Sequence, residues 1–411
     1  MTTATPDRTS STDSVKPTPK FRLDIEGLRA IAVVFVVVWH AGVPFLPGGF
    51  IGVDVFFVIS GFLMTGILYR ELESDRRINF LNFFSRRVKR LIPASALTIV
   101  VTLLAASVIL PASRVLEIAY DAIAATLYVV NWRLADEAVD YFAQDLSASP
   151  LQHFWSLAVE EQFYIFWPLL LGGVAVLVRA RICSARTGVT WALGITFLTS
   201  LLWSVLYTLT DPGRAYFVTT TRLWELALGG LVVVALARRS IFPRRFAAVW
   251  SWSGLAAIIF AGFVFTTEMA FPGWIALLPT VGTAALIVFT PSAGTAGPGA
   301  LLSLRPMTWL GSISYSLYLW HWPVIILGAA VITRSTREFT VAEGVLLAAL
   351  SIIPAWLSLK YVENPVRRAE WTNQTLGNSF FVALVATALP LALAMSLANN
   401  FRISEQIAMA Q

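Results

Sequence analysis

Three histidines, His40, His153 and His321, are the residues whose type and position in the sequence point most clearly to chemistry. Each lies in or beside a long apolar segment, and the polar stretches of the chain contain none. An ionisable side chain is costly inside an apolar segment and usually has a function there. Because imidazole accepts and returns protons near neutral pH, these histidines are candidates for acid–base chemistry.

Arg29 and His40 share the first apolar segment and are 11 residues apart. In an α-helix, 11 steps of about 100° end about 20° past three full turns, so both side chains project from one face. They are separated by about 16.5 Å along the helix axis. A cation and a titratable ring on one apolar helix predict a polar passage through the protein. The alternative is that Arg29 extends to the lipid headgroups while His40 bonds a neighbouring helix.

The second apolar segment provides a carboxylate partner for His40. Asp54 lies about one turn inside this segment, and a short connection joins it to the first segment. We therefore expect the two side chains at similar depth on adjacent helices. A carboxylate beside a histidine fixes its tautomer and increases its basicity, so an Asp54–His40 pair is predicted. The alternative is that Asp54 only caps its helix.

The fourth apolar segment begins with a group of polar and aromatic residues. His153 and Glu160 are seven residues apart, which places them on one helix face to within about 20°. Trp155 and Ser156 are expected to line the same entrance. Glu161 points about 100° away from Glu160, so at most one of the two faces a shared cavity. His153 also fits a position at the membrane interface among aromatic residues.

Two later apolar segments contain shorter polar patterns. Arg222 and Glu225 are three residues apart and can pair on one helix face; a structural ion pair and a binding role are both open. Tyr315, Tyr318 and His321 follow each other at intervals of three residues, which forms a polar stripe. The stripe could hold a sugar or polyol through hydroxyl groups and ring stacking, or it could supply hydrogen bonds between helices.

The most basic part of the sequence lies between the second and third apolar segments. Apolar residues recur at helical spacing over residues 78–91, which predicts an amphipathic helix on the cytoplasmic surface. Its cluster of Arg86, Arg87, Lys89 and Arg90 could hold phosphates through charge-assisted hydrogen bonds. It could equally anchor the helix to anionic lipid.

Composition predicts an all-α fold, a polytopic bundle of transmembrane helices. The chain is 57% hydrophobic and 13% charged, whereas soluble domains are about 25% charged. Runs of about 20 apolar residues are typical of membrane-spanning helices, and we expect about 11 of them. The predicted spans are residues 27–46, 50–70, 91–110, 154–178, 189–209, 217–237, 247–266, 273–290, 308–329, 339–361 and 379–398.

The distribution of basic residues predicts a cytoplasmic N-terminus and an outer C-terminus. With this orientation most of the 30 Lys and Arg residues lie in cytoplasmic segments, as the positive-inside rule requires. Residues 114–131 are then a helix at the outer face. We expect residues 1–20 to be a disordered cytoplasmic tail and residues 21–370 to form the main membrane domain. Residues 371–411 would add one transmembrane helix and a short outer tail.

Other classes of function find no support in the sequence. The net charge of +6 is explained by topology, so no nucleic-acid partner is predicted. The chain lacks a phosphate-binding Gly-Lys loop, a dinucleotide fingerprint and a nucleophile elbow. A single cysteine rules out an internal disulfide and a multi-cysteine metal site, and we expect neither a metal nor a tightly bound cofactor.

The chain resembles the integral-membrane acyltransferase family 3 of bacterial O-acyltransferases from about residue 21 to about residue 368. The resemblance rests on six ordered motifs: DIEGLRAIAVVFVVVWHAG, GGFIGVDVFFVISGFL, FFSRRVKRLIP, HFWSLAVEEQFYIFWP, SISYSLYLWHWP and YVENPVRR. It implies transfer of an acyl group, often acetyl, from cytoplasmic acyl-CoA to a hydroxyl of a glycan, a glycolipid or a related acceptor. Arg29 and His40 would be the essential pair. The supporting positions would be Asp54, Arg86, Arg87, Arg90 and Glu160.

These observations predict a multi-pass O-acyltransferase of the cell membrane. His40, oriented by Asp54 and supported by Glu160, would be the general base. Acyl-CoA would be the co-substrate, with its phosphates or pantetheine arm held by Arg29 and the basic helix. The residues expected to bind or support the acceptor are His153, Trp155, Ser156, Arg222, Glu225, Tyr315, Tyr318 and His321.

Three questions stay open at this point. A direct attack of the acceptor and a covalent acyl-histidine are not separated by the sequence. The chain could instead relay the acyl group across the membrane to a separate outer protein or SGNH-type domain. It could also be a transporter whose polar residues line a permeation path. Membrane lipids are expected partners in each case.

Overall fold

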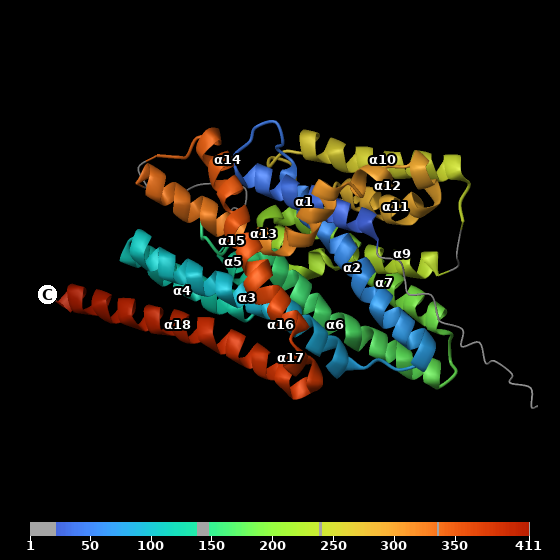
Figure 1. Cartoon of the computed structure of the whole chain (residues 1–411), viewed down its shortest axis with the longest axis horizontal. Helices are drawn as coiled ribbons and strands as arrows, with labels where there is room; N and C mark the ends of the chain where they lie inside the picture. Colours follow the sequence, from blue (N-terminus) through green and yellow to red (C-terminus); the bar gives the residue numbers. More distant parts are fainter. Residues whose placement is uncertain (1–21, 138–147, 238–240, 335–336, 411) are drawn as a thin grey trace, which may run out of the picture.

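All regular elements in the residues that the structure describes are helices, which confirms the predicted all-α class (Figure 1). The structure is a computed structural model and describes residues 22–137, 148–237, 241–334 and 337–410, with side chains to residue 400. The predicted tail at residues 1–20 lies outside the described residues.

The helices follow each other along the chain with short connections. The first half contains α1 (Leu23–His40), η1 (Gly49–Ile51), α2 (Gly52–Asp75), α3 (Phe80–Ile109), α4 (Ala112–Thr126), α5 (Val130–Asp136), α6 (Phe154–Arg179) and α7 (Ala185–Thr210). The middle contains α8 (Pro212–Phe217), η2 (Thr219–Thr221), α9 (Leu223–Leu236), α10 (Arg244–Val264), α11 (Leu277–Ala293), η3 (Gly294–Ala296) and α12 (Gly299–Leu302). The last part contains α13 (Arg305–Thr333), α14 (Val341–Leu350), α15 (Ile352–Ser358), the π-helical turn η4 (Leu359–Glu363), α16 (Asn364–Arg368), α17 (Glu370–Gln374) and α18 (Leu376–Ala410).

Nine helices in the described part of the chain are long and apolar enough to cross a membrane. They are α2 with η1, α3, α6, α7, α10, α11 with η3, α13, the run from α14 to α16, and α18. The predicted count of 11 is therefore not confirmed. The other two predicted spans are α1, which carries Asp24, Glu26 and Arg29 near its start, and α9, which has only 14 residues. The side of the membrane on which each end lies stays a prediction.

The basic segment is part of a longer helix, so the prediction of a separate surface helix at residues 78–91 was wrong. Helix α3 begins at Phe80, where the Asn79 side chain accepts a hydrogen bond from the backbone N–H of Asn82. It continues through Pro93 to Ile109. Proline removes one backbone hydrogen bond, and helices tolerate this where neighbouring helices support them. The basic cluster therefore lies on the first turns of a candidate span.

Helices α4 and α18 flank α3 on the outside of the bundle. The segment expected at the outer face forms α4 and α5, and α4 has 15 residues. The predicted additional helix is α18, which packs along α3 and α4 (Figure 1). Only 11% of its apolar window is buried, so most of its surface faces outward. This exposure is typical of a helix at the edge of a membrane bundle.

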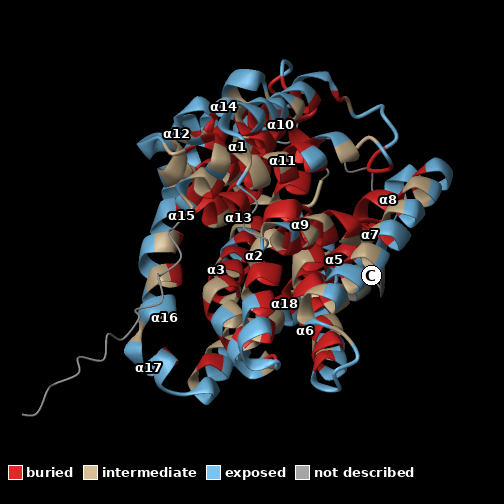
Figure 2. Cartoon of the chain, turned by 90° about the vertical axis from the view of Figure 1, so that its right-hand side faces the viewer, coloured by how far each residue is buried: buried red, intermediate tan, exposed pale blue. Residues whose placement is uncertain are grey.

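The core of the bundle contains α1, α2, α9 and α13, whose inner faces are buried (Figure 2). Helix α1 packs on α13 and α2, and α2 packs on α9. Two glycines bring α2 and α9 into close contact. A Cβ atom at Gly61 would overlap the backbone oxygen of Leu226, and one at Gly229 would overlap that of Val58. Small residues allow such close packing of membrane helices.

Gly61→Ala is expected to destabilise the protein, because the added methyl group meets a backbone atom that cannot rotate away. Overpacking of this kind costs about 1–3 kcal/mol, which exceeds the gain in helix propensity of about 1 kcal/mol. The matched control is Gly66→Ala on the same helix, where a Cβ atom would have ordinary contacts. Thermal unfolding in detergent should show a lower midpoint for Gly61→Ala only. Equal midpoints for the two variants would contradict the close contact.

Candidate functional site

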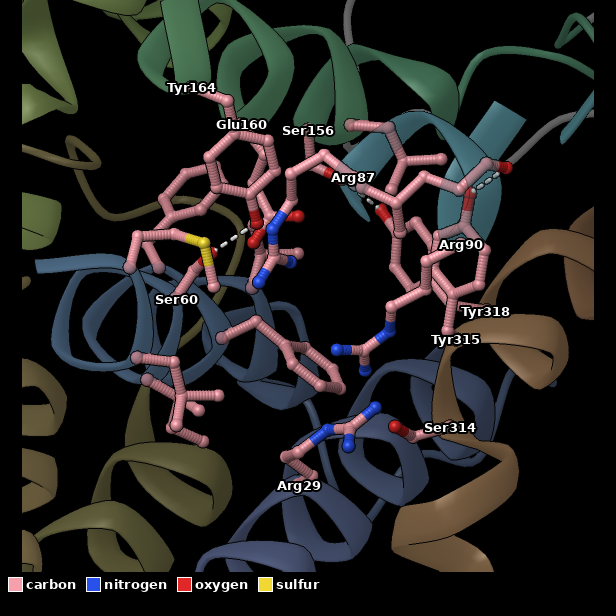
Figure 3. Close-up of a pocket in the computed structure, with 18 residues that line it drawn as sticks. Arg29, Ser60, Arg87, Arg90, Ser156, Glu160, Tyr164, Ser314, Tyr315 and Tyr318 are labelled. Atoms are coloured by element: carbon pink, nitrogen blue, oxygen red, sulfur yellow. Dashed lines mark hydrogen bonds between the residues drawn. The ribbon is translucent and has the colours of Figure 1, made fainter. Parts of the chain in front are cut away.

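A cavity between α1, α2, α3, α6 and α13 gathers seven of the fifteen predicted site residues (Figure 3). We call it the central cavity, and its empty space is about 720 Å³. Its polar lining consists of Arg29, Ser60, Arg87, Arg90, Ser156, Glu160, Tyr164, Ser314, Tyr315 and Tyr318.

Helix α6 contributes a stripe of three side chains at intervals of four residues. Ser156, Glu160 and Tyr164 line the central cavity, since residues four apart lie on one helix face. Glu161 does not line it, as its direction on the helix predicts. Tyr164 was not among the predicted residues, although one further step of four residues from Glu160 reaches it. Ser60 was not predicted either, and its hydroxyl lies 2.5 Å from that of Tyr164.

Three guanidinium groups point into the central cavity in Figure 3. Arg29 on α1 is held by Glu26, with Nη1 3.0 Å from a carboxylate oxygen. Arg87 on α3 lies over the ring of Tyr164, 5.4 Å from its centroid, and Arg90 is one turn further along α3. The carboxylate in the lining is that of Glu160. In the lining itself three guanidinium groups therefore accompany one carboxylate, and guanidinium groups at a cavity wall can bind an anionic ligand.

A second cavity shares part of this wall. We call it the basic hollow, and its empty space is about 1410 Å³. Its cationic lining consists of Arg70, Arg86, Arg87, Lys89, Arg90 and Arg367. Arg87 and Arg90 line both cavities, whereas Arg86 lines only the basic hollow. The predicted basic cluster thus separates two neighbouring spaces.

Hydroxyl groups form the side of the central cavity nearest to the histidines. The Tyr318 hydroxyl lies 2.6 Å from that of Ser156 and donates to the backbone oxygen of His153 at 3.0 Å. The Tyr315 hydroxyl donates to the backbone oxygen of Leu91 at 2.8 Å. The tyrosines of the predicted stripe therefore line the cavity and supply hydrogen bonds between helices, and the binding of a sugar or polyol stays a prediction.

The three histidines come together behind Tyr318, in a group that we call the histidine cluster. His40 Nδ1 lies 3.0 Å from His321 Nε2. The ring centroid of His153 lies 5.5 Å from that of His321, and His153 Nε2 is 3.0 Å from the backbone oxygen of Leu319. All three side chains are buried. The sequence indicated each histidine separately but did not indicate that they would meet.

The expected passage from Arg29 to His40 is interrupted. Both residues lie on the side of α1 that faces α13, but His40 is not in the lining of the central cavity. Tyr318 stands between, with its ring centroid 5.3 Å from that of His321. The expectation that Arg29 and His40 share a single lining was therefore wrong, because an aromatic residue of α13 fills the space between their levels.

The predicted Asp54–His40 pair was also wrong. Asp54 Oδ1 accepts a hydrogen bond from Arg222 Nη1 at 2.9 Å, and His40 bonds His321 instead. Asp54 pairs with Arg222 because it lies on the face of α2 that is directed towards α9. Asp54 and Gly61 are seven residues apart on α2, so they share a face, and this face packs on α9. The loop sets the depth of Asp54, but the packing of α2 on α9 sets its partner.

Arg222 is surrounded by partners and does not line the central cavity. The predicted pair with Glu225 is confirmed, at 2.9 Å between Nη1 and Oε1. The guanidinium also lies 5.5 Å from the ring centroid of Trp155 and 4.9 Å from that of Tyr216. Trp155 was expected to line the cavity entrance, and it packs against this cation instead. Asp54, Arg222 and Glu225 form a buried ion cluster.

A further buried carboxylate lies close to the central cavity. Glu363 ends the π-helical turn between α15 and α16, and its Oε2 accepts a hydrogen bond from Ser316 at 3.2 Å. The negative charge of Glu363 attracts the positive charges of Arg29 and Arg90. The motif YVENPVRR contains this residue, but the local pattern does not reveal the π-helical turn that directs it inward.

Comparison with known proteins identifies relatives of the chain. The sequence model of the acyltransferase domain family matches residues 22–397 of the chain. Peptidoglycan O-acetyltransferase OatA of Listeria monocytogenes is 33% identical over 367 residues, which are 87% of this chain and 58% of the relative. O-acetyltransferase OatA of Staphylococcus aureus is 33% identical over 362 residues, which are 85% of this chain and 58% of the relative. No solved structure matches.

Arg222→Gln is expected to unfold the protein at a markedly lower temperature. Loss of the cation leaves Asp54 and Glu225 as buried carboxylates beside each other, at a cost of about 3–5 kcal/mol. The matched control is Arg337→Gln, which removes an ion pair with Glu343 in which the arginine side chain is 49% exposed. Surface pairs contribute little, so the unfolding midpoint of this control should stay near that of the wild type. Similar midpoints for both variants would contradict the structural role of Arg222.

Proposed function

Because this chain belongs to the acyltransferase domain family, we propose that it transfers an acetyl group from cytoplasmic acyl-CoA to a hydroxyl of peptidoglycan. It is a multi-pass membrane protein, and we place it in the cell membrane. The chain spans a little over half the length of the curated relatives, at 58% of each, so their activity and acceptor come to this chain as part of the proposal. The observation that carries it is the convergence of three guanidinium groups on the central cavity.

The two neighbouring cavities suit the two parts of acyl-CoA. Phosphates prefer arginine because its planar group makes two parallel charge-assisted hydrogen bonds. The nucleotide phosphates would lie in the basic hollow, against residues such as Arg86 and Arg367. The narrow pantetheine arm would pass between Arg87 and Arg90 into the central cavity. No other cofactor and no metal takes part in this proposal.

The acetyl transfer takes place beside Tyr318, which separates the central cavity from the histidine cluster. The thioester carbonyl lies beside this tyrosine, which turns aside so that the acyl group reaches the histidine cluster. His40 takes the proton from the acceptor hydroxyl, and the oxygen attacks the carbonyl carbon. The C–O bond forms and the C–S bond breaks. The CoA thiolate leaves and receives the proton from His40, so charge and atoms balance.

Glu160 supports this reaction from the cavity wall. Its carboxylate lines the central cavity. The positive charges of Arg87, Arg29 and Arg90 attract it. A carboxylate among three arginines limits their mutual repulsion while the cavity is empty. We therefore assign Glu160 to the positioning of the arginines and to the exclusion of extra anions.

The test uses the full chain in lipid nanodiscs, where both faces of the membrane are accessible, with acetyl-CoA labelled on the acetyl group. Label that moves to added peptidoglycan fragments, with release of CoA thiol, supports the proposal. Label that stays on the protein until an outer acceptor protein is added supports a relay of the acyl group and overturns direct transfer. The absence of any thiol release, with or without acceptor, would overturn the acyltransferase function and favour a transporter.

His40→Ala is expected to abolish thiol release while acyl-CoA still binds. Loss of a general base lowers the rate by about 10²–10⁴-fold, and His40 does not line the central cavity. The rate of thiol release and the Kd for acetyl-CoA should be measured on the same preparation. Retained activity would show that His40 is not the base. A large rise in Kd would show that it belongs to the binding site instead.

Arg90→Gln is expected to raise the Kd for CoA by about 10-fold to 100-fold. A hydrogen bond between charged groups contributes about 1.5–3 kcal/mol, and each 1.4 kcal/mol changes affinity tenfold. The matched control is Arg245→Gln on α10, an exposed arginine that lines neither cavity. Isothermal titration in nanodiscs at two salt concentrations measures both variants. Equal Kd values for Arg90→Gln and the control would exclude the proposed path.

A further inference from the structure

The contact between His40 and His321 has a consequence for the proposed base. We propose that His321 is the positioning residue that decides which nitrogen of His40 accepts the proton. The catalytic part of this inference rests on the proposed function, whereas its structural part can be tested without any activity.

His321 holds its proton on Nδ1. This nitrogen lies 2.7 Å from the backbone oxygen of Tyr318 and 3.2 Å from that of Leu317. A carbonyl oxygen only accepts hydrogen bonds, so Nδ1 must be the donor. A neutral imidazole carries one N–H. The Nε2 of a neutral His321 therefore presents a lone pair, and it presents that lone pair to His40.

The lone pair of His321 in turn fixes the proton of His40. Since His40 Nδ1 lies 3.0 Å from His321 Nε2, it must donate its N–H there. His40 is thus held as the Nδ1–H tautomer, and Nε2 carries the basic lone pair. Free histidine in water prefers the opposite tautomer.

The contact between His40 and His321 cannot form when both imidazole rings are protonated. If both histidines were cations, Nδ1 of His40 and Nε2 of His321 would each carry a hydrogen at a separation of 3.0 Å. Burial of two like charges in an apolar interior is also costly. His321 is therefore neutral when His40 takes up the proton of the acceptor. Its lone pair then stabilises the new imidazolium, a role that a carboxylate has in the serine protease triad.

His153 does not belong to this hydrogen-bonded chain. Its Nε2 lies 3.0 Å from the backbone oxygen of Leu319, so Nε2 carries its N–H. Its contact with His321 is between rings, with centroids 5.5 Å apart. The tautomer of His40 should therefore depend on His321 and not on His153.

The first test is nitrogen NMR of the protein in lipid bilayers with ¹⁵N-labelled histidine. The chain has three histidines, and His40→Gln assigns the two signals of His40 by their loss. At mildly alkaline pH, His40 should show a protonated Nδ1 and an unprotonated Nε2. In His321→Leu, His40 should change towards the Nε2–H tautomer. A protonated Nε2 in the wild type, or a tautomer that stays the same in His321→Leu, would overturn the proposal.

The second test compares two replacements of His321 by steady-state kinetics. His321→Leu should lower kcat by about 10-fold to 100-fold, the usual effect of losing a partner that orients a functional histidine, with KM for acetyl-CoA unchanged. His321→Gln should recover most of this loss, because its amide oxygen can accept from His40. Equal losses in both variants, with unfolding midpoints near that of the wild type, would overturn the positioning role. If the wild type transfers no acetyl group, the proposed function fails while the NMR test still decides the tautomer.

Discussion

The cost of burying charge among apolar helices decides how this protein uses its arginines. Arg222 is fully buried and is matched by Asp54 and Glu225 and by aromatic rings. Its partners are internal, and it holds α2 to α9. Arg87 and Arg90 face the space between two cavities, and Glu160 is the carboxylate in the lining of the central one. Guanidinium groups at a cavity wall can bind an anion there through charge-assisted hydrogen bonds.

The same constraint explains the place of the histidine cluster. Neutral imidazoles can be buried if each N–H finds an acceptor, and backbone oxygens of Leu317, Tyr318 and Leu319 provide acceptors for two of the three rings. These oxygens belong to α13, which also carries Tyr318 in the wall of the central cavity. One helix therefore supports the base, separates it from the cavity and lines the cavity itself. A movement of α13 or of Tyr318 would couple ligand entry to access to His40.

Features that depend on one helix could be predicted from the sequence, and features that depend on two could not. The helical class, the Arg222–Glu225 pair and the direction of Glu160 follow from helical spacing alone. The partner of Asp54 depends on the close contact of Gly61 with α9, which no local pattern reveals. The partner of His40 depends likewise on how α1 and α13 align. Motif resemblance gave the family, and the matched residues 22–397 confirm it.

The central claim is that the arginine-lined cavities hold acyl-CoA with its thioester next to the histidine cluster. It is tested most directly by a structure of the protein with a non-hydrolysable acetyl-CoA analogue in a lipid nanodisc. The account predicts phosphates bound in the basic hollow, the pantetheine arm between Arg87 and Arg90, and the acetyl group beside Tyr318. An analogue bound at another surface, or bound with its acetyl group directed away from Tyr318, would contradict the account.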